Sequence, residues 1–248
     1  MSQNESEQGE IILAQSSFSD GSFYRFSQNV YWLMIANFMF VLSNILFIAV
    51  FLLWIPTITN AILFYVASLP MGPAIAALCH SLTKFTKDKD ISPMKTYLES
   101  YRKNGKEALK VWVPIITVVF ILVIDIQYFQ QNPTVFYQIL NGIFLVVLFL
   151  MTIFTFYSFL IMTHYRFRLR DIYRLSVYYL FTWIKVSSGN LCIVFLSIAL
   201  LFLTSDFIVL FLGSVLVWVL VLNSRTLLKD VKISFVKEEQ EGLEEVKA

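Results

Sequence analysis

Apolar residues fill most of the chain in long runs, which short polar or charged segments separate. The first run, Phe26–Thr83, contains no Asp, Glu, Lys or Arg, and it is too long for one crossing because about 20 residues span the hydrocarbon core of a bilayer. Trp54–Asn60 interrupts it with an interfacial aromatic residue, a proline and polar turn residues. The pattern therefore predicts two spans, near residues 30–53 and 61–82, joined by an external turn.

The later apolar runs predict four more spans, near residues 111–124, 134–163, 186–205 and 207–224. Asp206 stands where a carboxylate can accept hydrogen bonds from the first amides of the last of these helices. The runs are continuous, whereas the strands of a membrane β-barrel alternate in polarity. The predicted fold class is thus all-α: a polytopic helical membrane protein with about six transmembrane helices and two cytoplasmic amphipathic helices.

The two amphipathic helices are predicted from charged segments between the spans. The first lies near residues 92–104, with Ser92 as its cap and Asn104–Gly105 near its end. Its apolar residues recur at spacings of three and four beside charged ones, and its candidate partner-docking residues are Met94, Tyr97, Leu98, Tyr101, Arg102 and Lys103. The second, near residues 166–185, combines apolar residues with mainly basic charge. Such helices either lie on the membrane or dock a partner.

The distribution of charge predicts the topology. All 19 Lys and Arg residues fall in segments that six crossings place on one side of the membrane. The positive-inside rule makes that side cytoplasmic, which leaves both termini inside the cell in a multi-pass protein of the plasma membrane. The predicted organisation is a disordered acidic tail at residues 1–21, a single helical membrane domain at 22–224 and a charged cytoplasmic tail at 225–248.

Composition supports a membrane protein and argues against other classes. Hydrophobic residues make up 58% of the chain and charged residues 15%, and a net charge of +2 gives no reason to expect a nucleic-acid partner. Cys79 and Cys192 lie in apolar runs, which favours small core residues over a disulfide. Cys79 adjoins His80 without a cluster of further ligands in the sequence, so we expect a packed or interface-facing histidine, no metal and no cofactor.

Small residues recur at every fourth position in the second span, at Ser68, Gly72 and Ala76. This spacing puts them on one helix face and lets another backbone approach closely. The prolines beside them remove backbone donors and should kink or break the helix. The complete predicted packing seam contains Ser68, Pro70, Gly72, Pro73, Ala76 and Ala77. Close helix packing explains these residues without a ligand, so we prefer it to a substrate site.

The same stretch carries a family resemblance. Leu69–Pro70 and Gly72–Leu78, followed by a charged segment and by Met94–Asn104, resemble the YesL family of bacterial multi-pass membrane proteins of unknown function. The resemblance covers about Tyr31 to Pro114. It implies an association with carbohydrate uptake by ABC importers in Gram-positive bacteria.

The sequence favours a non-catalytic integral membrane accessory protein. It shows no phosphate-binding glycine loop, paired carboxylate motif or zinc signature, so we expect no enzymatic activity. The expected partners are permease or ATPase subunits of a carbohydrate ABC importer, the lipid bilayer and a second copy of the chain. An alternative for Tyr97 and Tyr101 is that they pack the docking helix onto the chain's own spans.

The alternative function is a small-solute transporter for sugar-type substrates. Carriers build their sites from polar residues and broken helices near the membrane midplane. Asn44 and Asn141, with the break expected at Pro70–Pro73, form the candidate constellation. No charged residue is predicted at the midplane to couple transport to an ion gradient, so this function ranks second.

Overall fold

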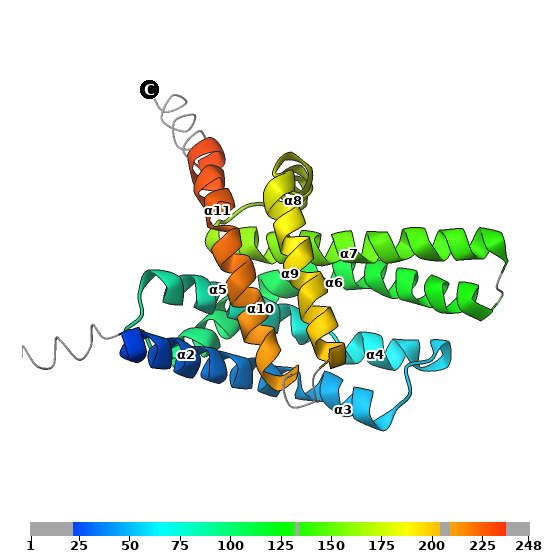
Figure 1. Cartoon of the computed structure of the whole chain (residues 1–248), viewed down its shortest axis with the longest axis horizontal. Helices are drawn as coiled ribbons and strands as arrows, with labels where there is room; N and C mark the ends of the chain where they lie inside the picture. The colour runs from blue at the N-terminus through cyan, green and yellow to red at the C-terminus, as the bar shows by residue number, and fades with distance from the viewer. Residues whose placement is uncertain (1–21, 132–133, 204–208, 237–248) are drawn as a thin grey trace, which may run out of the picture.

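The computed structural model describes residues 22–131, 134–203 and 209–236, and every regular element among them is helical (Figure 1). The elements in order are α2 (Ser22–Ser43), α3 (Ile45–Leu53), the 3-10 turn η1 (Ile58–Asn60), α4 (Ala61–Ala67), α5 (Met71–Lys87), α6 (Pro93–Gln131), α7 (Val135–His164), α8 (Leu169–Thr182), α9 (Ile184–Leu203), α10 (Val209–Asn223), α11 (Arg225–Val231) and the π-helical turn η2 (Lys232–Val236). The predicted tail at 1–21 and the cap at Asp206 lie outside the described residues.

The prediction of an all-α helical membrane protein is confirmed. Within the described ranges, α6 and α7 are each long and apolar enough to cross a membrane. Four further pairs of helices meet at bends, and the number of candidate spans becomes six if each bent pair counts as one. Each of the six contains one of the apolar runs of the sequence, and the pair α8 and α9 also includes the segment that was predicted as the second amphipathic helix.

α6 and α7 pack against each other as a long hairpin, drawn in green in Figure 1. α6 is one continuous helix of 39 residues, so the prediction of a surface helix that ends near Asn104–Gly105, before a separate span at 111–124, is wrong. Gly105 keeps a negative φ, and the buried Ala108 and Val111 hold the following turn against neighbouring helices. This packing outweighs the roughly 1 kcal/mol that a glycine costs inside a helix.

The first two predicted spans are each divided in two. α2 and α3 meet at Asn44 with a bend of 63°. Asn44 Nδ2 donates to the Phe40 carbonyl at 2.7 Å, and such side-chain bonds compete with the backbone ladder. α4 and α5 bend by 45° across a turn that contains Pro70. Pro73 falls in the first turn of α5, where its missing N–H has no partner to lose.

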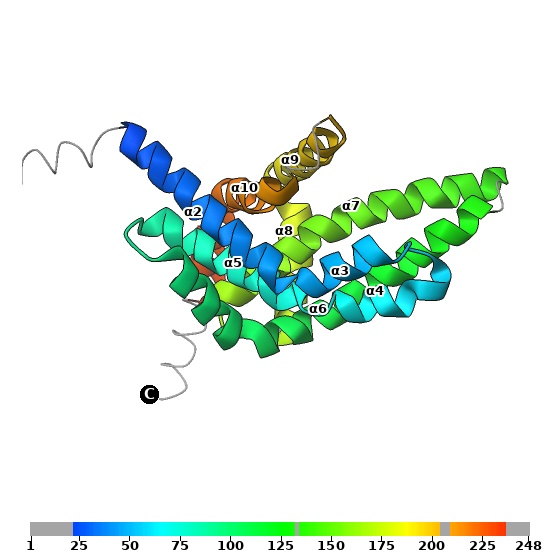
Figure 2. The same cartoon turned by 90° about the horizontal axis from the view of Figure 1, so that it is seen from below.

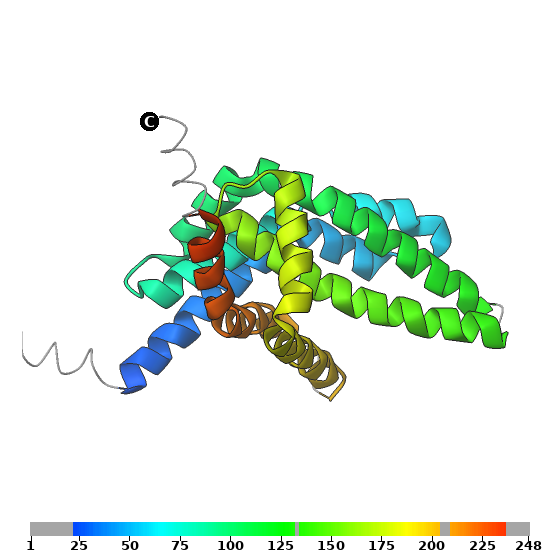
Figure 3. The ribbon, with the colours of Figure 1, turned by 90° about the horizontal axis from the view of Figure 1, so that it is seen from above.

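α8 is the second predicted amphipathic helix and lies across α6 and α7 (Figure 3). The Tyr173 hydroxyl donates to the Val111 carbonyl of α6 at 2.9 Å, and Leu175 and Tyr179 are buried. At Trp183 the chain turns by 93° into α9. α8 therefore ends shortly before residue 185, the end predicted for the second amphipathic helix. One face of α8 packs on the α6–α7 hairpin.

The last span also bends, because α10 and α11 meet at Ser224 at an angle of 53°. Leu227, Leu228 and Val231 of α11 are buried. Residues 225–231, predicted as the start of a charged tail, therefore pack on the bundle instead. Apolar residues between the charges give this segment one face that packs onto the bundle.

Two large buried clusters join the described helices, and a third, small one of Val50, Phe64 and Ala67 joins α3 to α4. The larger holds α5, α6, α7 and α8 to the carboxy-terminal helices and includes Tyr157 and Phe159. The smaller joins α2 to α5 and to the beginning of α6 around Trp32, Phe85 and Tyr97. Figure 2 shows α2 crossing α5. The predicted seam and one face of the predicted docking helix thus contribute to these buried clusters.

Candidate functional site

The predicted packing seam lies where α5 meets α6. Gly72 is buried against Trp112, and a Cβ atom at Gly72 would lie 2.5 Å from the Trp112 Cβ. Trp112 Nε1 donates to the Ser68 carbonyl at 2.9 Å, so the turn before α5 also binds α6. Ala76 and Ala77 are fully buried, Pro73 is buried and Pro70 is half-buried. The small residues permit this close approach of two backbones.

The predicted docking residues of α6 divide between two faces. Tyr97 is 0% exposed, and its hydroxyl donates to Ser43 Oγ at 3.1 Å. Tyr101 is half-buried and stacks on Tyr97 with ring centroids 6.3 Å apart. Tyr97 therefore packs the helix onto the chain's own spans, as the alternative interpretation stated. No partner can reach Tyr97 without displacing α2. The exposed face of the same helix carries Met94, Leu98, Arg102 and Lys103.

The two candidate intramembrane asparagines do not form one site. Asn44 is buried at the α2–α3 bend, and its Oδ1 has no hydrogen-bond partner. Asn141 lies on α7, and its Oδ1 is likewise buried without a partner. Across the described ranges no hydrogen bond links either side chain to the other or to Pro70–Pro73. The structure therefore does not bring the predicted residues of the transport site together.

A buried polar network that the sequence analysis did not identify joins α7, α9 and α10. Asn190 Nδ2 donates to Tyr157 Oη at 3.1 Å and to Ser224 Oγ at 3.0 Å, and Asn190 Oδ1 accepts from Asn223 Nδ2 at 2.8 Å. Ser187 Oγ lies 3.2 Å from Tyr157 Oη. The asparagines inside apolar runs could have indicated this network, because an amide without a hydrogen-bond partner is costly in lipid. The network holds α7, α9 and α10 together next to the bend between α10 and α11.

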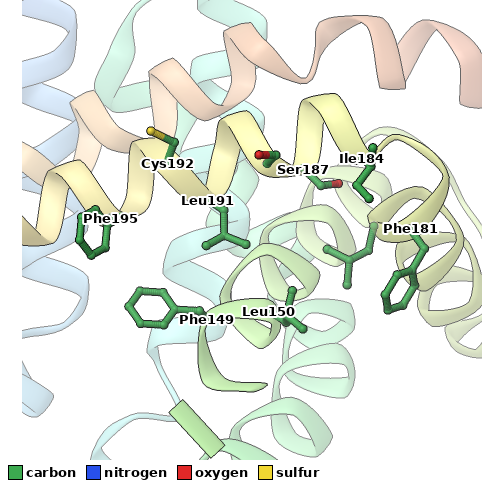
Figure 4. A pocket seen from close by; sticks show the side chains of 10 residues that line it. Phe149, Leu150, Phe181, Ile184, Ser187, Leu191, Cys192 and Phe195 are labelled. Atoms are coloured by element: carbon green, nitrogen blue, oxygen red, sulfur yellow. The ribbon is translucent and has the colours of Figure 1, made fainter. Parts of the chain in front are cut away.

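Two cavities between the helices have apolar linings. One of about 490 Å³ lies between α7, α8 and α9, and Figure 4 shows Phe149, Leu191 and Phe195 around it. Another of about 280 Å³ lies between α3, α4 and α6 and is lined by Phe47, Phe64 and other apolar residues. Such linings suit hydrocarbon, whereas a sugar-type solute needs several polar groups that converge on it. Neither cavity resembles a sugar-binding site.

The ionisable residues show limited clustering. Within the described ranges, no three His, Cys, Asp or Glu side chains are placed to hold one metal ion. Cys79 is buried and Cys192 is exposed, and both are free thiols.

Tyr165, which follows α7, donates its hydroxyl to the Leu228 carbonyl at 2.7 Å, and partial burial raises the pKa of Tyr165. This tyrosine ties the loop after α7 to α11.

Comparison with known proteins gives a match to one family model over part of the chain. Residues 33–126 match the model of the family described as "Protein of unknown function, DUF624". The matched region extends from α2 into the second half of α6, so it contains both the seam and the exposed face at the beginning of α6. No curated protein and no solved structure matches the chain.

Proposed function

We propose that this chain is a non-catalytic membrane accessory protein that docks a protein partner through the beginning of α6. The chain belongs through residues 33–126 to the YesL-like family DUF624. One observation carries the proposal. The inner face of this segment is fixed by packing, while its outer face is apolar, charged and exposed. A rigid exposed face of this kind is suited to recognition by another protein.

The docking face consists of Met94, Leu98 and Arg102, which follow one another at intervals of one helical turn. Met94 is 50% and Leu98 37% exposed, and Arg102 is exposed as well. Beside them Lys95 and Glu99 form an ion pair at 3.9 Å. A helix that only rests on anionic lipid is typically basic along its whole polar side. The mixed charge here favours a protein partner.

The partner that we propose is a permease or ATPase subunit of a carbohydrate ABC importer. This assignment follows from the family resemblance and extends it to a defined surface. We place the docking face in the cytoplasm of a bacterial cell, with both termini on the same side, because the basic residues gather at this end of the bundle. An importer ATPase is accessible from that side.

The proposed topology predicts the labelling of single cysteines. In a background without Cys79 and Cys192, a cysteine at the exposed Thr59, between α3 and α4, should react with a membrane-impermeant maleimide in intact cells. A cysteine at the exposed Lys106 of α6 should react only after permeabilisation. The opposite pattern of labelling would place the docking face outside the cell and exclude a cytoplasmic partner.

The docking proposal is tested by the double variant Leu98→Glu, Arg102→Glu. It should lower the amount of importer subunit that co-purifies with the protein by about tenfold or more, since one central anchor residue typically contributes at least 2 kcal/mol to an interface. The measurement is quantitative co-purification from native membranes, normalised to the level of the protein. Both side chains are exposed, so the membrane level should stay unchanged.

Arg174→Glu is the matched control, because Arg174 is an exposed cation on the other amphipathic helix, α8. It should leave co-purification unaffected. Retention of the partner by the α6 variant, or equal loss in the α8 control, would contradict docking at this face.

A further inference from the structure

A polar cavity of about 340 Å³ lies where α5, α6 and the end of α7 meet. It is at the basic end of the bundle, the end of the α6–α7 hairpin that lies to the left in Figure 1. Its lining comes from three helices and from the loop after α7, and it includes His80 and His164. Leu98 and Arg102 do not line it, so the cavity and the docking face are separate surfaces of α6.

The two histidines are each held by one ring nitrogen. His164 Nδ1 donates to the Leu160 carbonyl at 2.8 Å, and His80 hydrogen-bonds to the backbone of Thr163. The ring centroids are 6.2 Å apart. His80 Nδ1 is buried and has no hydrogen-bond partner. A buried nitrogen without a partner costs about 1 to 3 kcal/mol, so this position calls for a group that can complete its hydrogen bond.

Three cations from different elements line the same cavity. Lys84 comes from α5, Lys103 from α6 and Arg166 from the loop after α7. In the part of the chain that the structure describes, none of them lies within 4 Å of a carboxylate. Cations that converge from separate elements and stay unpaired form a typical site for a phosphate group, which accepts several charge-assisted hydrogen bonds at once.

Acceptors lie beside the cations. Glu99 and Glu107 line the cavity with Asn104, whose Nδ2 donates to Ser100 Oγ at 3.2 Å. Carboxylate and amide oxygens can accept hydrogen bonds from hydroxyl groups. A ligand that satisfies the whole lining therefore combines a phosphate with hydroxyl groups. The volume is at the lower end of the range of small-molecule pockets and suits a ligand about as large as glycerol phosphate.

We propose that this cavity binds a phosphomonoester, with Lys84, Lys103 and Arg166 around the phosphate, while the remaining ring nitrogens of His80 and His164 accept hydrogen bonds from hydroxyl groups of the ligand. The phosphomonoester group occurs in a soluble small molecule such as glycerol 3-phosphate, which adds free hydroxyl groups, and in the headgroup of phosphatidic acid, where only the P–OH can donate a hydrogen bond. Both sources are compatible with a cavity at the basic ends of membrane helices, where lipid headgroups lie. The inference does not depend on the docking proposal, because it concerns the purified protein alone.

The test uses the full chain in nanodiscs and measures the shift of its thermal unfolding midpoint. Glycerol 3-phosphate is added to protein in phosphatidylcholine discs, with glycerol and inorganic phosphate as comparisons, and discs that contain phosphatidic acid form the second arm. We expect stabilisation in at least one arm, none by glycerol, and a loss of affinity of about tenfold for each cation removed in Lys84→Gln and Arg166→Gln.

The side chains of Lys84 and Arg166 are both exposed, which preserves folding. Lys106→Gln, an exposed cation of α6 outside the cavity, is the matched control and should bind normally.

Each outcome decides the proposal. Stabilisation by glycerol 3-phosphate that Lys84→Gln and Arg166→Gln abolish supports it with a soluble ligand, and the same dependence in phosphatidic acid discs supports it with a lipid ligand. Absence of stabilisation in both arms overturns it. Stabilisation that persists in the cavity variants, or that Lys106→Gln removes equally, also overturns it, since the charge effect would then not be specific to this site.

Discussion

Replacing Gly72 by leucine is expected to lower the stability of the purified protein in detergent by about 1 to 3 kcal/mol or more, the usual cost of overpacking a core. Even the Cβ of alanine would lie 2.5 Å from Trp112 Cβ and 2.6 Å from Trp112 Cγ. Trp112 Cβ is fixed directly to the backbone of α6, so the clash can be relieved only if α5 and α6 separate. Separation would also stretch the bond from Trp112 Nε1 to the Ser68 carbonyl.

Gly105→Ala is the matched control for this variant, because nothing lies within 4 Å of a Cβ at Gly105. It should leave the midpoint of thermal unfolding unchanged or raise it, since alanine favours a helix over glycine by about 1 kcal/mol. If Gly72→Leu were as stable as the parent, the seam would face lipid instead of α6.

Asn190→Ala is expected to destabilise the protein by about 1 to 3 kcal/mol, which is the cost of leaving buried polar groups unpaired. The side chain is 0% exposed and takes part in three hydrogen bonds, to Tyr157, Asn223 and Ser224. Its loss leaves the Asn223 amide and the Tyr157 hydroxyl with fewer partners in an apolar surrounding. Thermal unfolding in detergent measures the effect.

Asn141→Ala provides the comparison for Asn190→Ala. The Oδ1 atom of Asn141 is buried without a partner, so its removal should leave stability unchanged or raise it slightly. Equal losses in the two variants would mean that the hydrogen bonds of Asn190 add nothing to the stability of the bundle.

The features that a single stretch of sequence determines were predictable. Uninterrupted apolar runs define the spans, because the bilayer sets their length and composition. The recurrence of Ser68, Gly72 and Ala76 predicted a face for close packing, and the structure places Gly72 of that face against Trp112. Leu69–Leu78 and Met94–Asn104 together gave the family resemblance, and the family model matches residues 33–126, which include both stretches.

The features that depend on contacts between distant segments were not predictable. Tyr97 has the spacing of an exposed stripe, but α2 covers it, and that contact joins residues more than fifty positions apart. Asn104–Gly105 has the local pattern of a helix end, yet tertiary packing continues the helix. His80 and His164 are far apart in the sequence and become neighbours only when α5 meets the end of α7. Local patterns carry no information about such pairings.

The continuity of α6 has a mechanical consequence. A helix of 39 residues is a rod of roughly 58 Å at 1.5 Å per residue, and its two ends lie on different sides of any membrane that it crosses. Pro114 lies inside this rod, and there the missing amide donor makes bending easiest. Any tilt of the segment before Pro114 carries Met94, Leu98 and Arg102 together with the cavity residues Lys103 and Glu107, because all five belong to one rigid lever.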